Sequence, residues 1–291
     1  MKNNNFCARK LVLVWLSLLY SEFYIKIKIK LNYMVNKINI KPISIWKSLL
    51  LFGIPGLAYY VGFYYGMPLC MNTDLPKTFS FFFFMWLPIV PLLPVSILLF
   101  KREQKRQPYL SFKKRFRLKK ITKNDLLWIA GGIVLTFTFE ELLTPISRWQ
   151  ASFSLFAPPE HFPSLLNPLK EAVLPMTHFY GEPLHGKWLL ILSIIIFHPI
   201  GQIGEEFMWR GYILPRQEQN YGTWAWLVNG LMWAYILHFF LRWNFIAFLP
   251  SMLITPFIAQ KTKNTWVAVI VHAVPNMILL FTFFLLGVIS F

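Results

Sequence analysis

Long apolar runs constrain this chain more than any other feature of its sequence. An α-helix needs about 20 apolar residues to cross a bilayer. Five runs meet that length: 44–66, 78–100, 126–146, 187–210 and 264–288. Two shorter runs, 222–240 and 243–260, are interrupted by polar residues and proline. We therefore predict an all-α fold, a polytopic transmembrane helical bundle with about seven spans, one more or one fewer.

The composition agrees with a membrane protein. The 291 residues are 56% hydrophobic and only 14% charged, whereas soluble domains contain roughly 25% charged residues. The two cysteines, Cys7 and Cys70, are too few for a disulfide framework or a zinc site. We expect a multi-pass protein of the cell membrane that is surrounded by membrane lipid and has no separate soluble domain.

The positive charge is concentrated in one segment. Residues 101–123 contain eleven Lys or Arg and a single acid, Glu103. Basic residues between two apolar spans favour the cytoplasmic side, near anionic lipid. Such a run could also bind nucleic acid, but the aromatic residues lie in the spans rather than among the basic residues. We predict a cytoplasmic loop and no nucleic-acid partner.

The charge and apolar patterns divide the chain into four parts. Residues 1–43 are a basic N-terminal segment, of which we interpret residues 1–33 as dispensable because Met34 is a second plausible start. Residues 44–146 hold the N-terminal transmembrane helices and the cytoplasmic basic loop. Residues 147–186 are a proline-rich extramembrane or interfacial loop. Residues 187–291 form the last part, which contains most of the polar residues within apolar runs.

Two carboxylates and an arginine stand at the end of the run 187–210. A lone charge at the bilayer centre costs from ~2.5 to more than ~10 kcal/mol, so such residues are expected to have a use. Glu206 and Arg210 are four positions apart and can pair on one helix face. Glu205 is turned about 100° away and has no partner on this helix. It is therefore a candidate general base, although a structural ion pair at a helix end is the alternative.

Three further polar residues lie in the later apolar runs. His238 stands in one of them, and His272 and Asn276 share a helix face in another. Together with Glu205 they indicate one shared cavity, although each histidine alone could equally make a helix–helix hydrogen bond. A glutamate and a histidine can polarise a water molecule, while a second histidine and an asparagine can donate to an oxyanion. This chemistry suits amide hydrolysis, with a zinc site as the mechanistic alternative.

The segments EEFMWR, LMWAYILHFF and VHAVPN resemble the three motifs of the CPBP family, the CAAX proteases and bacteriocin-processing enzymes that are also called ABI proteins. The matching residues are Glu205, Glu206 and Arg210 in the first motif, His238 in the second, and His272 and Asn276 in the third. The aromatic residue expected four positions before His238 is Ala234 here, and Trp233 stands one place earlier. The resemblance covers about residues 187–280.

This resemblance implies an intramembrane glutamic-type endopeptidase whose CPBP-like catalytic core is residues 187–291. It implies a membrane-associated peptide or a lipidated protein as substrate and no cofactor. The implied roles are water activation by Glu205 and His238, an oxyanion pocket of His272 and Asn276, and structural support by Glu206 and Arg210. The alternative function is a non-catalytic bacteriocin immunity or interaction protein of the same fold. A proton-coupled transporter is a third hypothesis.

Two other polar features are interpreted as structural. Glu140 and Glu141 form a second carboxylate pair, but Pro145 takes the place of the arginine. His198 is interpreted as a helix-packing residue. Simple alternation of the spans also puts His238 at the opposite end of its span from Glu205. The two can meet only if a helix is re-entrant, broken or tilted, and we expect this in the interrupted runs 222–240 and 243–260.

Overall fold

Helices make up nearly all of the regular structure. The computed structural model describes residue 24 and residues 40–171 and 174–290. The helices are α2 (Ile45–Val61), η1 (Gly62–Gly66), α3 (Met67–Met71), α4 (Lys77–Trp86), α5 (Leu92–Arg106), α6 (Phe112–Arg115), α7 (Lys123–Ala151), α8 (Trp188–Glu206), η2 (Phe207–Ile213), α9 (Leu214–Tyr221), η3 (Gly222–Trp224), α10 (Ala225–Tyr235), η4 (Leu237–Asn244), α11 (Phe245–Thr262) and α12 (Thr265–Ile289). Strands β1 (His178–Phe179) and β2 (Glu182–Pro183) pair as an antiparallel hairpin. The predicted all-α class is confirmed.

The described residues contain five helical stretches that are long and apolar enough to cross a membrane. They are Ile45–Met71, Lys123–Ala151, Trp188–Tyr235, Leu237–Thr262 and Thr265–Ile289. The run predicted at 78–100 is divided into α4 and α5 by a turn that contains Pro88 and Pro91. The polytopic bundle is confirmed, whereas the count of seven spans stays a prediction. Residues 1–33, interpreted as dispensable, lie outside the described residues except for residue 24.

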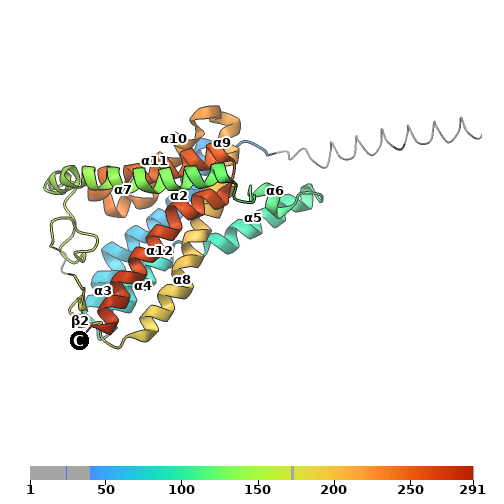
Figure 1. The fold of residues 1–291 in the computed structure, drawn as a ribbon. Coiled ribbons are helices and arrows are strands. Elements are labelled where there is room, and N and C mark those ends of the chain that lie inside the picture. Colours follow the sequence, from blue (N-terminus) through green and yellow to red (C-terminus); the bar gives the residue numbers. More distant parts are fainter. Residues whose placement is uncertain (1–23, 25–39, 172–173, 291) are drawn as a thin grey trace, which may run out of the picture.

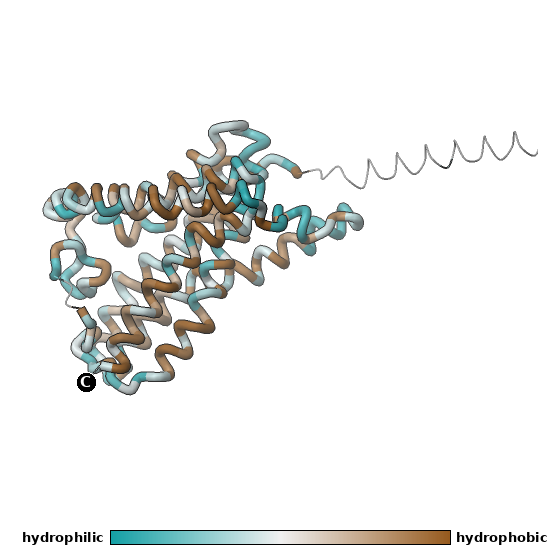
Figure 2. The backbone as a smooth tube through the Cα atoms, viewed as in Figure 1, coloured by the Kyte–Doolittle hydropathy of each residue, from teal (hydrophilic) through white to brown (hydrophobic). Residues whose placement is uncertain are grey.

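The long helices form two groups. α7 packs along α11, and α12 packs along α8. In Figure 1, α7 and α11 run across the top of the view, while α8 and α12 run obliquely downward. Figure 2 shows hydrophobic residues along α7, α8 and α12 and hydrophilic residues around α6. Leu127 and Leu142 of α7 are 73% and 64% exposed. Apolar surface of this extent is expected to contact lipid.

Local capping explains where several helices begin. The Ser44 hydroxyl accepts a hydrogen bond from the Lys47 N–H at the start of α2. Thr122 and Asp125 form a reciprocal capping box at the start of α7. Asn264 accepts from the Trp266 N–H at the start of α12. In each case a side-chain oxygen satisfies a backbone N–H that has no partner within the helix.

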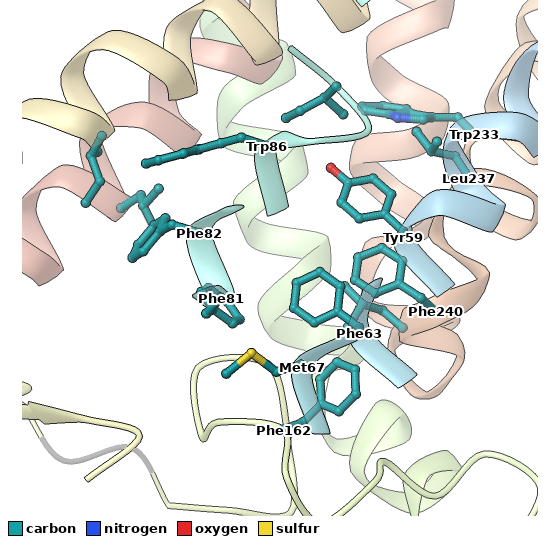
Figure 3. Packing of buried hydrophobic residues seen from close by; sticks show 14 of the residues in the cluster. Tyr59, Phe63, Met67, Phe81, Phe82, Trp86, Phe162, Trp233, Leu237 and Phe240 are labelled. Carbon is teal, nitrogen blue, oxygen red and sulfur yellow. The ribbon is translucent and has the colours of Figure 1, made fainter. Parts of the chain in front are cut away.

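Aromatic rings fill the interior between α2 and η4. Phe52 stacks on Trp209 with the ring centroids 4.1 Å apart, and Tyr59 stacks on Phe240 at 4.4 Å. Figure 3 shows Tyr59, Phe63 and Phe240 together. A Cβ atom on Gly56 would lie 2.4 Å from the carbonyl oxygen of Ile236. Glycine therefore lets α2 approach the backbone directly beside the second motif.

The predicted interruption between α10 and α11 is a break in the helix. The chain passes through the 3₁₀ segment η4, in which His238 (φ −91°, ψ 20°) and Leu241 (φ −114°, ψ 38°) have non-helical backbone angles. The prolines of this region, Pro250 and Pro256, lie inside α11. The break therefore stands at the histidine itself and not at a proline.

The basic loop is docked on the segment that follows the first motif. Arg115 is 1% exposed and donates to the carbonyl oxygens of Gly211 and Tyr212 at 2.9 and 3.2 Å. Glu103, the single acid of the loop, pairs with both Arg115 and Arg216. Burial lowers the pKa of Arg115 to about 10, so it remains charged at neutral pH. Nine of the eleven Lys and Arg of the loop are exposed, so the loop presents a positively charged surface.

The β hairpin is tied to α4 by one carboxylate. Glu182 accepts hydrogen bonds from the N–H groups of Lys77 and Thr78 at 2.7 and 3.2 Å, at the start of α4. It also accepts from the Thr78 hydroxyl and pairs with Lys187 at 2.8 Å. Burial alone would raise the pKa of Glu182, but these hydrogen bonds outweigh it and lower the pKa to about 2. The carboxylate thus serves as the cap that Pro76 cannot provide.

Candidate active site

α8 brings the paired carboxylates into the interior of the bundle. Glu205 is 4% exposed and Glu206 is fully buried. A Cβ atom on Gly204 would lie 2.8 Å from the backbone N of Leu93, so a glycine is needed for α8 to approach α5 this closely. After Glu206 the helix widens into the π-helical segment η2. Such π-helical turns are frequent at functional sites.

Glu206 and Arg210 form the ion pair that their spacing predicts. Arg210 Nη1 donates to Glu206 Oε1 at 2.8 Å, and both side chains are 0% exposed. His272 Nδ1 lies 2.9 Å from the same Glu206 oxygen. The Arg210 guanidinium also lies 3.7 Å from the ring centroid of Trp233. One carboxylate oxygen therefore connects the first motif to the third.

Glu205 has partners that the sequence analysis missed. Its Oε1 accepts hydrogen bonds from the indole N–H groups of Trp209 at 3.3 Å and Trp233 at 3.2 Å. The expectation that Glu205 has no partner on its own helix is wrong, because Trp209 follows it by one turn in η2. The indole N–H is a donor that can hold a carboxylate without neutralising it.

The hydrogen bonds of the two histidines define which nitrogen faces the cavity. His238 Nδ1 lies 2.9 Å from the Trp233 carbonyl oxygen, which can only accept. Nδ1 therefore carries the proton, and Nε2 of the neutral ring is a free acceptor. His272 Nδ1 donates in the same way to the Glu206 carboxylate, so His272 Nε2 can donate only when the ring is an imidazolium.

Asn276 is held by a residue outside the motifs. His198 Nε2 lies 3.0 Å from Asn276 Oδ1. When the oxygen of the amide is engaged by a ring N–H, the Asn276 NH₂ group remains available as a donor. His198 is 3% exposed, and it precedes Glu205 by seven residues, two helical turns on the same face. That spacing is the sequence signal that could have placed His198 at the site.

Four of the six motif residues line one cavity of about 380 Å³. Glu205, His238, His272 and Asn276 line it, together with His198, Gln202, Glu140 and Ser251. Glu206 and Arg210 do not line the cavity, and both side chains are fully buried. Simple alternation of the spans puts His238 and Glu205 at opposite ends. The break at η4 explains how the two can nevertheless face one cavity. A hollow of about 490 Å³ beside Asp74, Glu182 and Lys187 contains none of the motif residues.

Glu140 has a different position from the one its sequence context indicated. The sequence predicts a structural or interfacial role for Glu140. In the structure Glu140 lines the cavity and is half-buried, whereas Glu141 is exposed. Ser251 of α11 lines the same cavity as Glu140. Neighbouring residues of a helix differ by about 100° in direction, and only packing against α11 decides which of the two carboxylates faces inward.

A zinc site has no ligand set in this part of the chain. Among residues 24, 40–171 and 174–290, no three His, Cys, Asp or Glu side chains are grouped so that they could hold a metal ion. Zinc needs three or four such ligands within about 2.0–2.3 Å. Metal independence of the site stays a prediction.

The fold and the cavity define a polytopic membrane protein with an internal site of carboxylate, imidazole and amide groups. Residues 186–278 match the family model described as Type II CAAX prenyl endopeptidase Rce1-like. This match contains all six motif residues and supports the predicted resemblance to the CPBP family of CAAX proteases. Neither a curated protein nor a solved structure matches the chain. The family supports a membrane protease in general, with a membrane-lipid environment and a peptide or protein substrate.

Proposed function

We propose that this protein is an intramembrane glutamic-type endopeptidase that hydrolyses a peptide bond of a membrane-associated protein or peptide. The observation that carries the proposal is the convergence of Glu205, His238, His272 and Asn276 on one cavity. These residues come from α8, η4 and α12, which are far apart in the sequence. Burying polar and ionisable side chains inside an otherwise apolar bundle costs free energy, which favours a functional role for them.

In the proposed reaction, Glu205 and His238 activate the water. Two indole N–H groups hold Glu205 Oε1, which orients the carboxylate and leaves Oε2 toward the cavity. His238 Nε2 is a free acceptor because Nδ1 is engaged. Glu205 would take a proton from a water molecule between these two acceptors as the water oxygen forms a bond to the carbonyl carbon of the scissile amide. The C–N bond would then break as Glu205 gives this proton to the leaving amine, which leaves the other product as a carboxylic acid.

The oxyanion would be stabilised from α12. The Asn276 NH₂ group is available because His198 engages the amide oxygen. His272 would donate from Nε2 as an imidazolium, whose positive charge faces the Glu206 carboxylate. Arg210 forms an ion pair with the same Glu206 carboxylate. Donors that are fixed before the reaction are the main source of rate enhancement in such pockets.

The cavity walls indicate the class of substrate. Phe63, Phe248 and Phe283 are among the aromatic side chains that line it. Apolar walls of this kind fit an apolar peptide segment or an attached lipid. The matched family model is described by prenyl endopeptidase activity, so a prenylated protein is one proposed substrate and an unmodified membrane peptide is another. We also propose the cell membrane as the location, with the basic loop in the cytoplasm.

Glu205→Gln tests the proposal. Glutamine retains the size of the side chain and an oxygen for the two indoles but cannot take up a proton. Peptides in membranes from cells with the wild-type protein and with Glu205→Gln are compared, and a substrate found in this way is assayed with purified protein. We expect cleavage to fall by ~10²–10⁴-fold or more at equal amounts of folded protein. Glu141→Gln, which changes an exposed carboxylate, is the matched control.

The opposite result would reject a peptidase. If Glu205→Gln cleaves as fast as the wild type, or if no peptide differs between the two membranes, the non-catalytic immunity or interaction function takes its place. Metal dependence is measured on the same preparation. Chelator that abolishes cleavage together with stoichiometric bound zinc would contradict the metal-free mechanism.

A further inference from the structure

We infer that Glu140 is a subsite for a cationic group of the substrate, a lysine or arginine side chain close to the scissile bond. The inference rests on the proposed peptidase function. Glu140 lies on α7, outside all three motifs and outside the family match at residues 186–278. It nevertheless lines the same cavity as Glu205 and His238.

The carboxylate has no cationic partner of its own. Within residues 24, 40–171 and 174–290, every ion pair involves one of four other acids, namely Glu103, Glu182, Glu206 and Glu218. Glu206, by contrast, is neutralised by Arg210. A carboxylate in an apolar helix is costly unless it is paired or faces a cavity. Glu140 faces the cavity, so its counter-charge can come from a bound molecule.

The position of Glu140 suits a side-chain subsite. Glu140 and Ser251 come from α7 and α11, which pack together, while Glu205 and Asn276 come from α8 and α12. Figure 1 shows these as two differently inclined groups of helices. A peptide in the cavity would present its scissile bond to α8 and α12 and one side chain to α7 and α11. A lysine or arginine there would form a charge-assisted hydrogen bond with Glu140.

A purely structural role is the competing explanation, because Glu140 and Ser251 lie on α7 and α11, which pack together. Glu140→Gln separates the two roles. Glutamine retains the volume and the hydrogen-bonding capacity of the side chain, but it removes the negative charge. A structural role predicts unchanged selectivity in this variant, whereas the subsite predicts that the preference for a cation is lost.

The experiment uses the full-length protein in lipid nanodiscs and internally quenched peptides. Each peptide consists of alanine, leucine and phenylalanine, and one position at a time holds lysine, norleucine or glutamate. At one position we expect the wild-type kcat/KM to be at least about tenfold higher for lysine than for norleucine. Glu140→Gln should cleave both at the norleucine rate, and Glu140→Lys should prefer glutamate. Glu141→Gln should retain the wild-type preference.

The outcomes separate this inference from the proposed function. Wild-type cleavage without a preference for lysine at any position, or a preference that survives in Glu140→Gln, overturns the subsite but leaves the peptidase intact. Absence of Glu205-dependent cleavage of every peptide rejects both. If Glu140→Gln does not fold, the comparison of lysine, acetyl-lysine and norleucine peptides on the wild type decides, because neither acetyl-lysine nor norleucine carries the charge and both should lose the preference.

Discussion

Arg210→Met leaves the Glu206 carboxylate buried without its main counter-charge. Both side chains are 0% exposed, and they share one hydrogen bond of 2.8 Å. Removing one partner of such a pair costs about 3–5 kcal/mol. His272 remains on the same Glu206 oxygen at 2.9 Å and offsets part of the loss, so the lower end, about 3 kcal/mol, is expected. At roughly 2–4 °C per kcal/mol, the melting temperature should fall by about 6–12 °C.

The assay is thermal unfolding in detergent, followed by tryptophan fluorescence. Arg148→Met is the matched control, because Arg148 is an exposed arginine of α7 without an ion pair among the described residues. The double variant Glu206→Gln with Arg210→Met removes both charges. It should melt at a higher temperature than Arg210→Met alone, since no uncompensated charge remains. A melting temperature of Arg210→Met within about 2 °C of the wild type, or a double variant no more stable than the single one, would refute this reasoning.

Three further predictions concern other parts of the molecule. His198→Ala should lower kcat at least about tenfold, but by less than the ~10²–10³-fold loss of a direct oxyanion donor. KM should change little, because His198 acts through Asn276. An effect confined to KM would contradict this positioning role. The pKa of Glu182 is lowered from 4.5 to about 2, so the stability that Glu182 contributes is present above pH 4.5 and is lost as the pH falls toward 2. The melting-temperature difference between the wild type and Glu182→Gln should therefore shrink over that interval, and a difference independent of pH would show that the carboxylate charge plays no part. Ser111→Cys, in a chain whose two native cysteines are replaced by serine, should react with a membrane-impermeant thiol reagent only after the cells are opened, because the basic loop is predicted to be cytoplasmic; labelling of intact cells would invert the topology.

Much of the fold and of the candidate site could be predicted from local patterns. The apolar runs 44–66, 126–146 and 264–288 correspond closely to spans in the structure, because length and apolarity are properties of consecutive residues. The Glu206–Arg210 pair also follows from its spacing, since the helical repeat alone puts positions i and i+4 on one face. The six motif residues and the family were recognisable for the same reason.

The long-range parts of the site depend on tertiary packing. The turn between α4 and α5 divides a run that length alone assigns to one span. The position of His238 depends on the break at η4, where Gly56 lets α2 lie against the backbone. Trp233, one position before Ala234, donates to Glu205 and lies under the Arg210 guanidinium, and residue spacing alone does not indicate these two contacts.

The sequence by itself predicted the all-α, membrane-spanning fold and the motif residues of the candidate site. The tertiary structure alone decided which of Glu140 and Glu141 faces the cavity, which nitrogen of His238 and His272 is free, and that His198 holds Asn276. The physical reason is that helical periodicity is set by hydrogen bonds between residues four apart. The meeting of residues 30 to 70 positions apart is set by the packing of whole helices, to which every side chain in the interface contributes.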